Sequence, residues 1–153
     1  MTSARRLLFC SRSFYLDDSN GAAVAHRTLA RSLVAWGTPV EALSGVVIDG
    51  GGGADPAEVL ATRGIAFLGI GGDSWAIGAG GIDASDPANL RASVGGVPLT
   101  VSRRPLRRLA HPDPFEVAEL LRLFEATRRR FRPDVLVTST RDAPAPSPAS
   151  RGS

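Results

Sequence analysis

A polar loop between a short apolar run and a helical segment is the part of the chain best suited to binding a ligand. The apolar run covers residues 7–10, the loop extends from Ser11 to Asn20, and Gly21 begins the helical segment. In α/β proteins, ligands bind at loops that leave the carboxyl ends of strands. Backbone amides at a helix start also favour anions such as phosphate. The pattern indicates a binding loop; the alternative is that Gly21 only lets the helix and the strand pack closely.

Two glycine-rich segments, residues 69–74 and 78–81, are candidates for a dinucleotide site. Such a fingerprint must open a helix, whereas Asp73 and Ser74 are followed by further glycines. We therefore predict mainly loop over residues 69–87, without a nucleotide site.

Arginines at residues 103–108 and 128–132 are candidates for a nucleic-acid surface. The net charge is only +3, and aromatic residues that could stack on bases make up only 6% of the chain. We interpret these arginines as a solvated face, which could also bind anionic acceptor molecules or lipid head groups. We expect no nucleic-acid partner.

Histidine and cysteine are too few for most metal sites, because the chain has two histidines and one cysteine. Cys10 ends a buried run and is expected to act as a small hydrophobic residue, since no neighbouring base is identifiable. We interpret His26 as a packing or surface residue, and Asp17 and Asp18 as solvated rather than as a cation site. We predict no metal and no cofactor, and we identify no catalytic residue.

Capping patterns and apolar runs predict the secondary structure. The sequences Asp55-Pro56-Ala57-Glu58 and Asp113-Pro114-Phe115-Glu116 are typical of helix starts. The residues Val94-Gly95-Gly96-Val97 predict a tight hairpin. We expect strands near residues 6–11, 39–47, 65–69, 90–94, 97–102 and 134–138. We expect helices near residues 21–36, 56–63 and 114–130, with Gly37 just past the end of the first.

Each long helix is predicted to present one apolar face. In the first helix the expected buried stripe is Ala22, Ala25, Leu29, Leu33 and Trp36, and in the last helix the face is Val117, Leu120, Leu121 and Phe124. Alternating strands and helices predict an α/β fold. The expected form is a Rossmann-like parallel sheet with flanking helices and a β-hairpin inserted before the last helix.

The 153 residues predict one domain over 1–138 and a disordered Pro/Ala/Ser-rich tail over 139–153. No apolar stretch approaches the roughly 20 residues that a transmembrane helix needs. The N-terminus also lacks the pattern of a signal peptide. We therefore expect a cytoplasmic protein.

Four segments occur in the order and spacing of a known family: Leu7-Leu8-Phe9-Cys10-Ser11, Asn20-Gly21-Ala22-Ala23, Leu29-Ala30-Arg31-Ser32-Leu33 followed by Gly37, and Phe131-Arg132-Pro133-Asp134-Val135-Leu136-Val137. The chain thereby resembles the N-terminal domain of family-4-type glycosyltransferases of the GT-B fold. The resemblance implies half of a GT-B architecture, in which this half lines the acceptor side and a nucleotide-sugar donates the glycosyl group.

The resemblance also implies ligand-binding roles for Asp18, Ser19, Asn20 and Gly21, because the family's glycine-rich loop contacts donor or acceptor groups in the cleft. The family often has two glycines where this chain has Asn20-Gly21, but asparagine tolerates left-handed backbone angles better than most residues.

The family's second domain, which holds the nucleotide-sugar, has no counterpart in these 153 residues. We therefore expect a truncated or frameshifted product that is inactive alone; a natural short protein is the alternative origin. Unpaired sheet edges could also lead the chain to self-associate. The alternative function is a non-catalytic phosphate- or nucleic-acid-binding α/β module.

Overall fold

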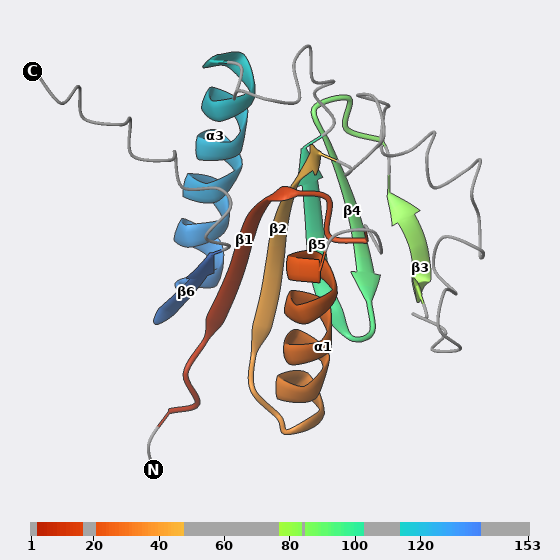
Figure 1. Cartoon of the computed structure of the whole chain (residues 1–153), viewed down its shortest axis with the longest axis vertical. Coiled ribbons are helices and arrows are strands. Elements are labelled where there is room, and N and C mark those ends of the chain that lie inside the picture. Colours follow the sequence, from red (N-terminus) through yellow and green to blue (C-terminus); the bar gives the residue numbers. More distant parts are fainter. Residues whose placement is uncertain (1–2, 17–20, 48–76, 84, 103–113, 139–153) are drawn as a thin grey trace, which may run out of the picture.

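The computed structural model describes residues 3–16, 21–47, 77–83, 85–102 and 114–138. Within these residues the chain forms one mixed sheet with two helices, an α/β arrangement (Figure 1). The elements are β1 (Leu7–Ser13), α1 (Gly21–Ala35), β2 (Val40–Val47), β3 (Ile77–Asp83), β4 (Asn89–Val94), β5 (Val97–Ser102), α3 (Pro114–Phe131) and β6 (Val135–Thr138). None of the helices described is long and apolar enough to cross a membrane.

The strands lie in the order β3-β4-β5-β2-β1-β6. The four strands β5, β2, β1 and β6 are mutually parallel, whereas β4 pairs antiparallel with β5 and β3 pairs antiparallel with β4. The expected parallel sheet is therefore confirmed for these four strands, and the sheet as a whole is mixed. The expected strand at 65–69 and helix at 56–63 lie outside the described residues.

The hairpin prediction is confirmed. β4 and β5 join at Gly95 and Gly96, whose φ angles of 57° and 80° match the positive values that a type I′ turn requires. The hairpin is more than an insertion, because β5 also pairs with β2 and so joins the parallel part of the sheet. The prediction of mainly loop over 69–87 is wrong at β3, where residues 77–83 form an edge strand paired to β4. Pairing to a neighbour thus overrides the low strand preference of glycine.

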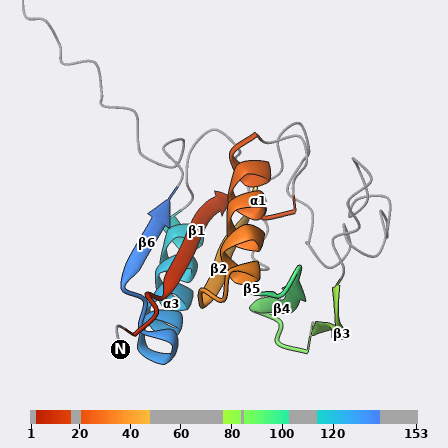
Figure 2. The ribbon, with the colours of Figure 1, turned by 90° about the horizontal axis from the view of Figure 1, so that it is seen from below.

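The two helices lie on opposite faces of the sheet (Figure 2). On the α1 face, Phe9, Ala30 and Leu99 belong to a large buried cluster. On the α3 face the cluster is smaller, with Leu8, Leu43 and Leu123 fully buried. Successive residues of β1 point to opposite faces, so this one strand contributes to both clusters.

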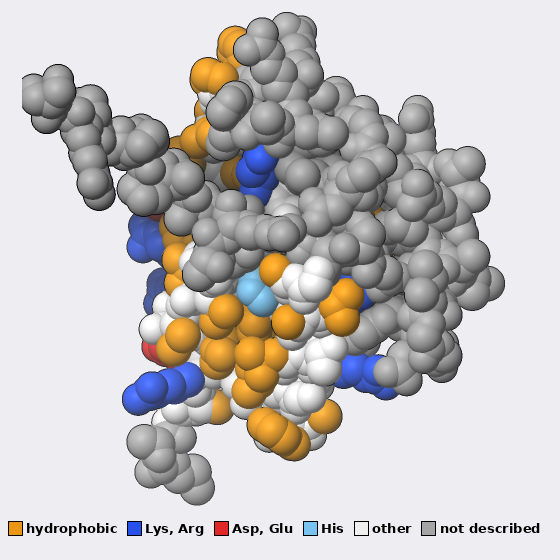
Figure 3. All heavy atoms as spheres, viewed as in Figure 1, with side chains coloured by type: hydrophobic (Ala, Val, Ile, Leu, Met, Phe, Trp, Pro, Cys, Tyr) orange, Lys and Arg blue, Asp and Glu red, His pale blue; other side chains and the backbone are white. Residues whose placement is uncertain are grey.

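The predicted buried stripe of α1 is confirmed only at Leu33, which is partly buried against the core, and in part at Ala22, which is half-buried. The buried residues are Ala23, Arg27 and Ala30, whereas Leu29 is 46% and Trp36 is 77% exposed. The helix is turned so that two small alanines approach the sheet and the Arg27 guanidinium reaches the backbone after β1. Ala25 is also exposed, and Figure 3 shows hydrophobic side chains gathered beside α1 on this face of the molecule.

The end of α1 is as predicted. Gly37 has a φ of 81°. Its N–H donates to the Val34 carbonyl at 2.9 Å, and the Thr38 N–H donates to the Leu33 carbonyl at 2.9 Å. This is the Schellman pattern that satisfies the last carbonyls of a helix.

The Pro133-Asp134 pair anchors β6 to the start of β1. The Arg6 N–H donates to Asp134 Oδ2 at 2.8 Å. The N–H groups of Asp134 and Val135 donate to the Arg6 carbonyl at 2.8 and 3.1 Å. These bonds hold β6 in register beside β1, with Leu7 opposite Val135.

The polar loop expected from Ser11 onward is wrong in its first part. β1 continues to Ser13, and Phe14, Tyr15 and Leu16 are buried in the core. The β1–β2 register shifts after Ser11, and two residues of β2 then lie opposite one residue of β1. A β-bulge of this kind bends the strands locally.

The bulge brings Gly45 against the backbone of Arg12. A Cβ atom added at Gly45 would overlap the Arg12 carbonyl oxygen. Any residue other than glycine would therefore force the backbone to move. Glycine is therefore required here by close approach rather than by its φ angle.

We predict that Gly45→Ala lowers the free energy of unfolding by about 1–3 kcal/mol, because β1 and β2 must separate at the bulge. Gly21→Ala is the matched control, since an added Cβ there meets nothing within 4 Å. Its effect should stay within about 0.5 kcal/mol. Urea denaturation of both variants measures the difference, and equal losses would contradict the role of Gly45.

Candidate functional site

Of the four ligand-binding residues expected from the sequence, only Gly21 is among the described residues. Asp18, Ser19 and Asn20 lie outside them. Gly21 is the exposed first residue of α1, and an added Cβ there would contact none of the described residues within 4 Å. Among the described residues, close packing of helix against strand therefore does not explain a glycine at this position.

The backbone that leads into this loop is firmly held. The Tyr15 N–H donates to the Ser44 hydroxyl at 3.3 Å, and the Arg27 guanidinium donates to the Tyr15 carbonyl at 2.7 Å. Arg27 and Ser44 are both fully buried. Burial raises the pKa of Tyr15 to about 12, although the nearby Arg27 cation lowers it in part. The chain thus leaves the sheet at a point held by two buried polar side chains.

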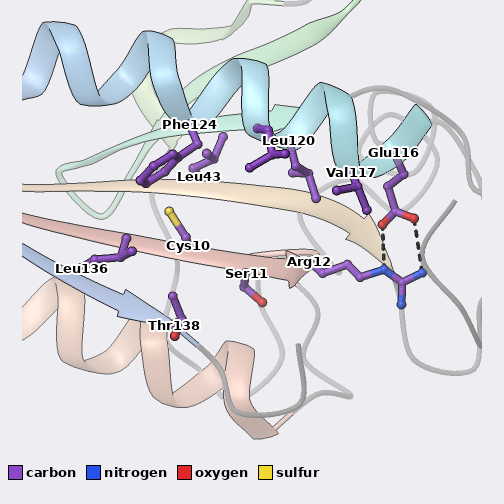
Figure 4. Close-up of a pocket in the computed structure, with 11 residues that line it drawn as sticks. Cys10, Ser11, Arg12, Leu43, Glu116, Val117, Leu120, Phe124, Leu136 and Thr138 are labelled. Atoms are coloured by element: carbon purple, nitrogen blue, oxygen red, sulfur yellow. Dashed lines mark hydrogen bonds and ion pairs between the residues drawn. The ribbon is translucent and has the colours of Figure 1, made fainter. Parts of the chain in front are cut away.

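A pocket of about 360 Å³ lies on the other face of the sheet, beside the carboxyl ends of β1 and β6 (Figure 4). The strands contribute Cys10, Leu43 and Leu136 to its lining. Leu136 is 49% exposed, because β6 is the edge strand and α3 lies mainly over β2 and β5. We call this pocket the α3 groove.

The wall of the α3 groove is the apolar face predicted for the last helix: Val117, Leu120, Leu121 and Phe124. The prediction that these four residues lie on one face of the helix is confirmed. That face does not pack fully against the sheet, since Val117 is 39% and Leu121 is 57% exposed. The residues that α3 buries are Glu116, Leu123 and Thr127.

An ion pair forms the polar end of the α3 groove. Arg12 Nε donates to Glu116 Oε1 at 2.7 Å, and Arg12 Nη2 donates to Glu116 Oε2 at 3.3 Å (Figure 4). Glu116 is 3% exposed, and the Arg12 side chain is 17% exposed. Glu116 lies in the first turn of α3, where a carboxylate also suits the helix dipole. Sequence reasoning missed this pair, because the two residues are 104 positions apart and no local pattern links them.

Other sequence candidates have structural roles. His26 packs edge-on against Phe9, with ring centroids 5.4 Å apart, as expected of a packing residue. Arg128 pairs with Glu125, and Arg130 with Glu41. Residues 78–81 lie in strand β3 and open no helix. Residues 69–74, residues 103–108 and Asp17 lie outside the described residues, and the described part of the chain holds no group of three metal-ligating side chains.

No protein-family model, curated protein or solved structure matches this chain. Function is therefore inferred from the residues and their geometry.

We predict that Cys10 is nearly unreactive in the folded protein. Burial disfavours the thiolate and raises the pKa of Cys10 to about 12. Since the thiolate is the reacting form, Ellman's reagent at pH 8 should react at least about 100-fold more slowly with the folded chain than with the urea-unfolded chain. Equal rates would show that the groove leaves this thiol open to solvent.

We also predict that Glu116→Ala lowers the free energy of unfolding by about 2–3 kcal/mol, because a mostly buried guanidinium loses its carboxylate. Glu125→Ala is the control on the same helix, where the exposed pair with Arg128 contributes less than about 1 kcal/mol. In the double variant Arg12→Ala/Glu116→Ala, the loss should be smaller than the sum of the single losses. An additive result would mean that the two residues do not act as a pair.

Proposed function

We propose that this chain is the acceptor-side half of a GT-B glycosyltransferase that uses a nucleotide-sugar donor. The observation that carries the proposal is the position of Gly21. It opens α1, directly after the loop from the carboxyl end of β1, and none of the described residues would contact a Cβ added to it. The loop Asp18-Ser19-Asn20-Gly21 would contact the ligand, as in the family that the sequence resembles.

The order of the parallel strands supports the proposal. Numbered by their order along the chain, the four described parallel strands β5-β2-β1-β6 follow the order 3-2-1-4, which matches the first four strands of the Rossmann order 3-2-1-4-5-6. In such sheets the ligand binds outside the carboxyl ends of the strands where the order reverses. Here the reversal lies between β1 and β6, and β1 is the strand that leads to Gly21.

The alternative, a phosphate- or nucleic-acid-binding module, has less support. Among the described arginines, Arg128 and Arg130 each face a carboxylate, so the end of α3 offers less positive charge than the sequence suggests. In a GT-B enzyme, by contrast, the cleft lies between two domains, and the second domain grips the diphosphate of the donor. The acceptor-side half alone would then hold a donor weakly.

We predict millimolar or weaker binding of nucleotide-sugars to the chain, and no glycosyl transfer by it alone. A few charge-assisted hydrogen bonds at one loop contribute ~1.5–3 kcal/mol each, while association costs at least ~4 kcal/mol. Amide NMR with UDP-glucose and GDP-mannose should show the largest shifts at Gly21 and its neighbours, and Gly21→Ala should reduce them. The control is Gly96, in the β4–β5 turn, whose amide should not shift.

Two results would refute the proposal. Micromolar donor affinity by calorimetry would mean that these residues hold the whole donor site. Shifts confined to arginine-rich segments, equal for inorganic phosphate and for nucleotide-sugars, would instead favour the phosphate-binding module.

A further inference from the structure

The α3 groove exposes more apolar surface to solvent than a helix packed fully against a sheet would leave. Across it, Leu121 of α3 and Leu136 of β6 are 57% and 49% exposed. Its floor is formed by Cys10 and Leu43. The exposed leucines therefore line one continuous hollow rather than lying singly on the surface, and such a hollow marks a binding site more often than an isolated apolar residue does.

The size of the groove fits a small molecule better than a protein partner. Its volume of about 360 Å³ lies near the lower end of the ~300–1,000 Å³ range of ligand pockets. Eleven of the described residues line it, whereas a stable protein interface uses about 20–30 residues on each side. Because most of these side chains are apolar, the hollow suits the apolar part of a small ligand, such as one alkyl chain.

The polar end of the groove indicates which head group such a ligand carries. Arg12 and Glu116 neutralise each other at 2.7 Å, and the other polar side chains in the lining are those of Ser11 and Thr138. An anionic head would have to compete with Glu116 for Arg12, and a cationic head would have to compete with Arg12 for Glu116. A neutral head with several hydroxyl groups can donate to or accept from this pair without breaking it.

We propose that the α3 groove binds the alkyl chain of a neutral, hydroxyl-bearing amphiphile, whose head lies at the ion pair of Arg12 and Glu116. The head then lies at the same edge of the sheet as Gly21, because Arg12 is near the carboxyl end of β1 and the loop to Gly21 follows it. The identification of this amphiphile as the sugar acceptor rests on the proposed function, whereas its binding in the α3 groove does not.

Alkyl β-glucosides are the probes, used below their critical micelle concentrations and followed by leucine methyl NMR and calorimetry. From hexyl to heptyl to octyl glucoside, the affinity should rise about threefold to fourfold for each added methylene. The shifted methyl groups should include those of Leu121 and Leu136. Octyl sulfate and octyltrimethylammonium should bind more weakly than octyl glucoside, because their heads are charged.

Leu121→Glu should weaken octyl glucoside binding at least about tenfold, and Leu121→Ala should weaken it less; because Leu121 is 57% exposed, both variants are expected to fold. Leu29→Glu is the matched control, since Leu29 is 46% exposed on α1, on the opposite face. Circular dichroism establishes that each variant is folded.

The proposal is overturned if affinity does not depend on chain length, or if Leu29→Glu weakens binding as much as Leu121→Glu. It is also overturned if sedimentation shows a dimer that Leu121→Glu dissociates, because a second copy then fills the groove. If octyl glucoside does not bind in the groove but nucleotide-sugars still shift the Gly21 amide, the glycosyltransferase proposal stands. If octyl glucoside binds as expected but the chain also binds a nucleotide-sugar with micromolar affinity, only the glycosyltransferase proposal is refuted.

Discussion

The contact between the Arg12 carbonyl and Gly45 is the constraint on which both parts of the candidate site depend. β1 lies between β2 and β6 and pairs with both, so the bulge opposite Arg12 determines the direction in which β1 ends. On one face Arg12 meets Glu116 at the end of the α3 groove. Beyond Ser13 the chain turns into the core of the other face. One close backbone approach thus positions both parts of the candidate site.

The two faces of the sheet are filled differently. On the α1 face, Phe14 and Leu16 complete a large core, and the buried Arg27 satisfies the Tyr15 carbonyl. A buried guanidinium is costly unless it is hydrogen-bonded, so Arg27 ties the helix to the loop that precedes it. On the α3 face the helix lies toward β2 and β5, and the sheet beside it remains partly open. The densely packed α1 face positions the loop before α1, and the less densely packed α3 face provides the α3 groove.

Whether a sequence-based prediction is correct depends on how far apart in the chain the interacting residues lie. The Gly95-Gly96 turn, the Gly37 cap and the limits of α3 depend on neighbouring residues, and these predictions are confirmed. The spacing of apolar residues alone predicts a buried stripe on α1 that includes Leu29 and Trp36. The structure buries Ala23 and Arg27 instead, because small residues let the helix approach the sheet and the buried Tyr15 carbonyl needs a donor.

Caps, turns and apolar runs act over a few residues, so the amino-acid sequence alone predicts the α/β class and the limits of most of the described elements. The sequence does not predict that β5 joins the parallel strands, that Gly45 must be glycine, or that Arg12 and Glu116 close an apolar groove. Each of these depends on backbone or side-chain atoms from distant parts of the chain that meet only after the sheet has formed. A residue's type and neighbours do not specify which distant residue it will meet.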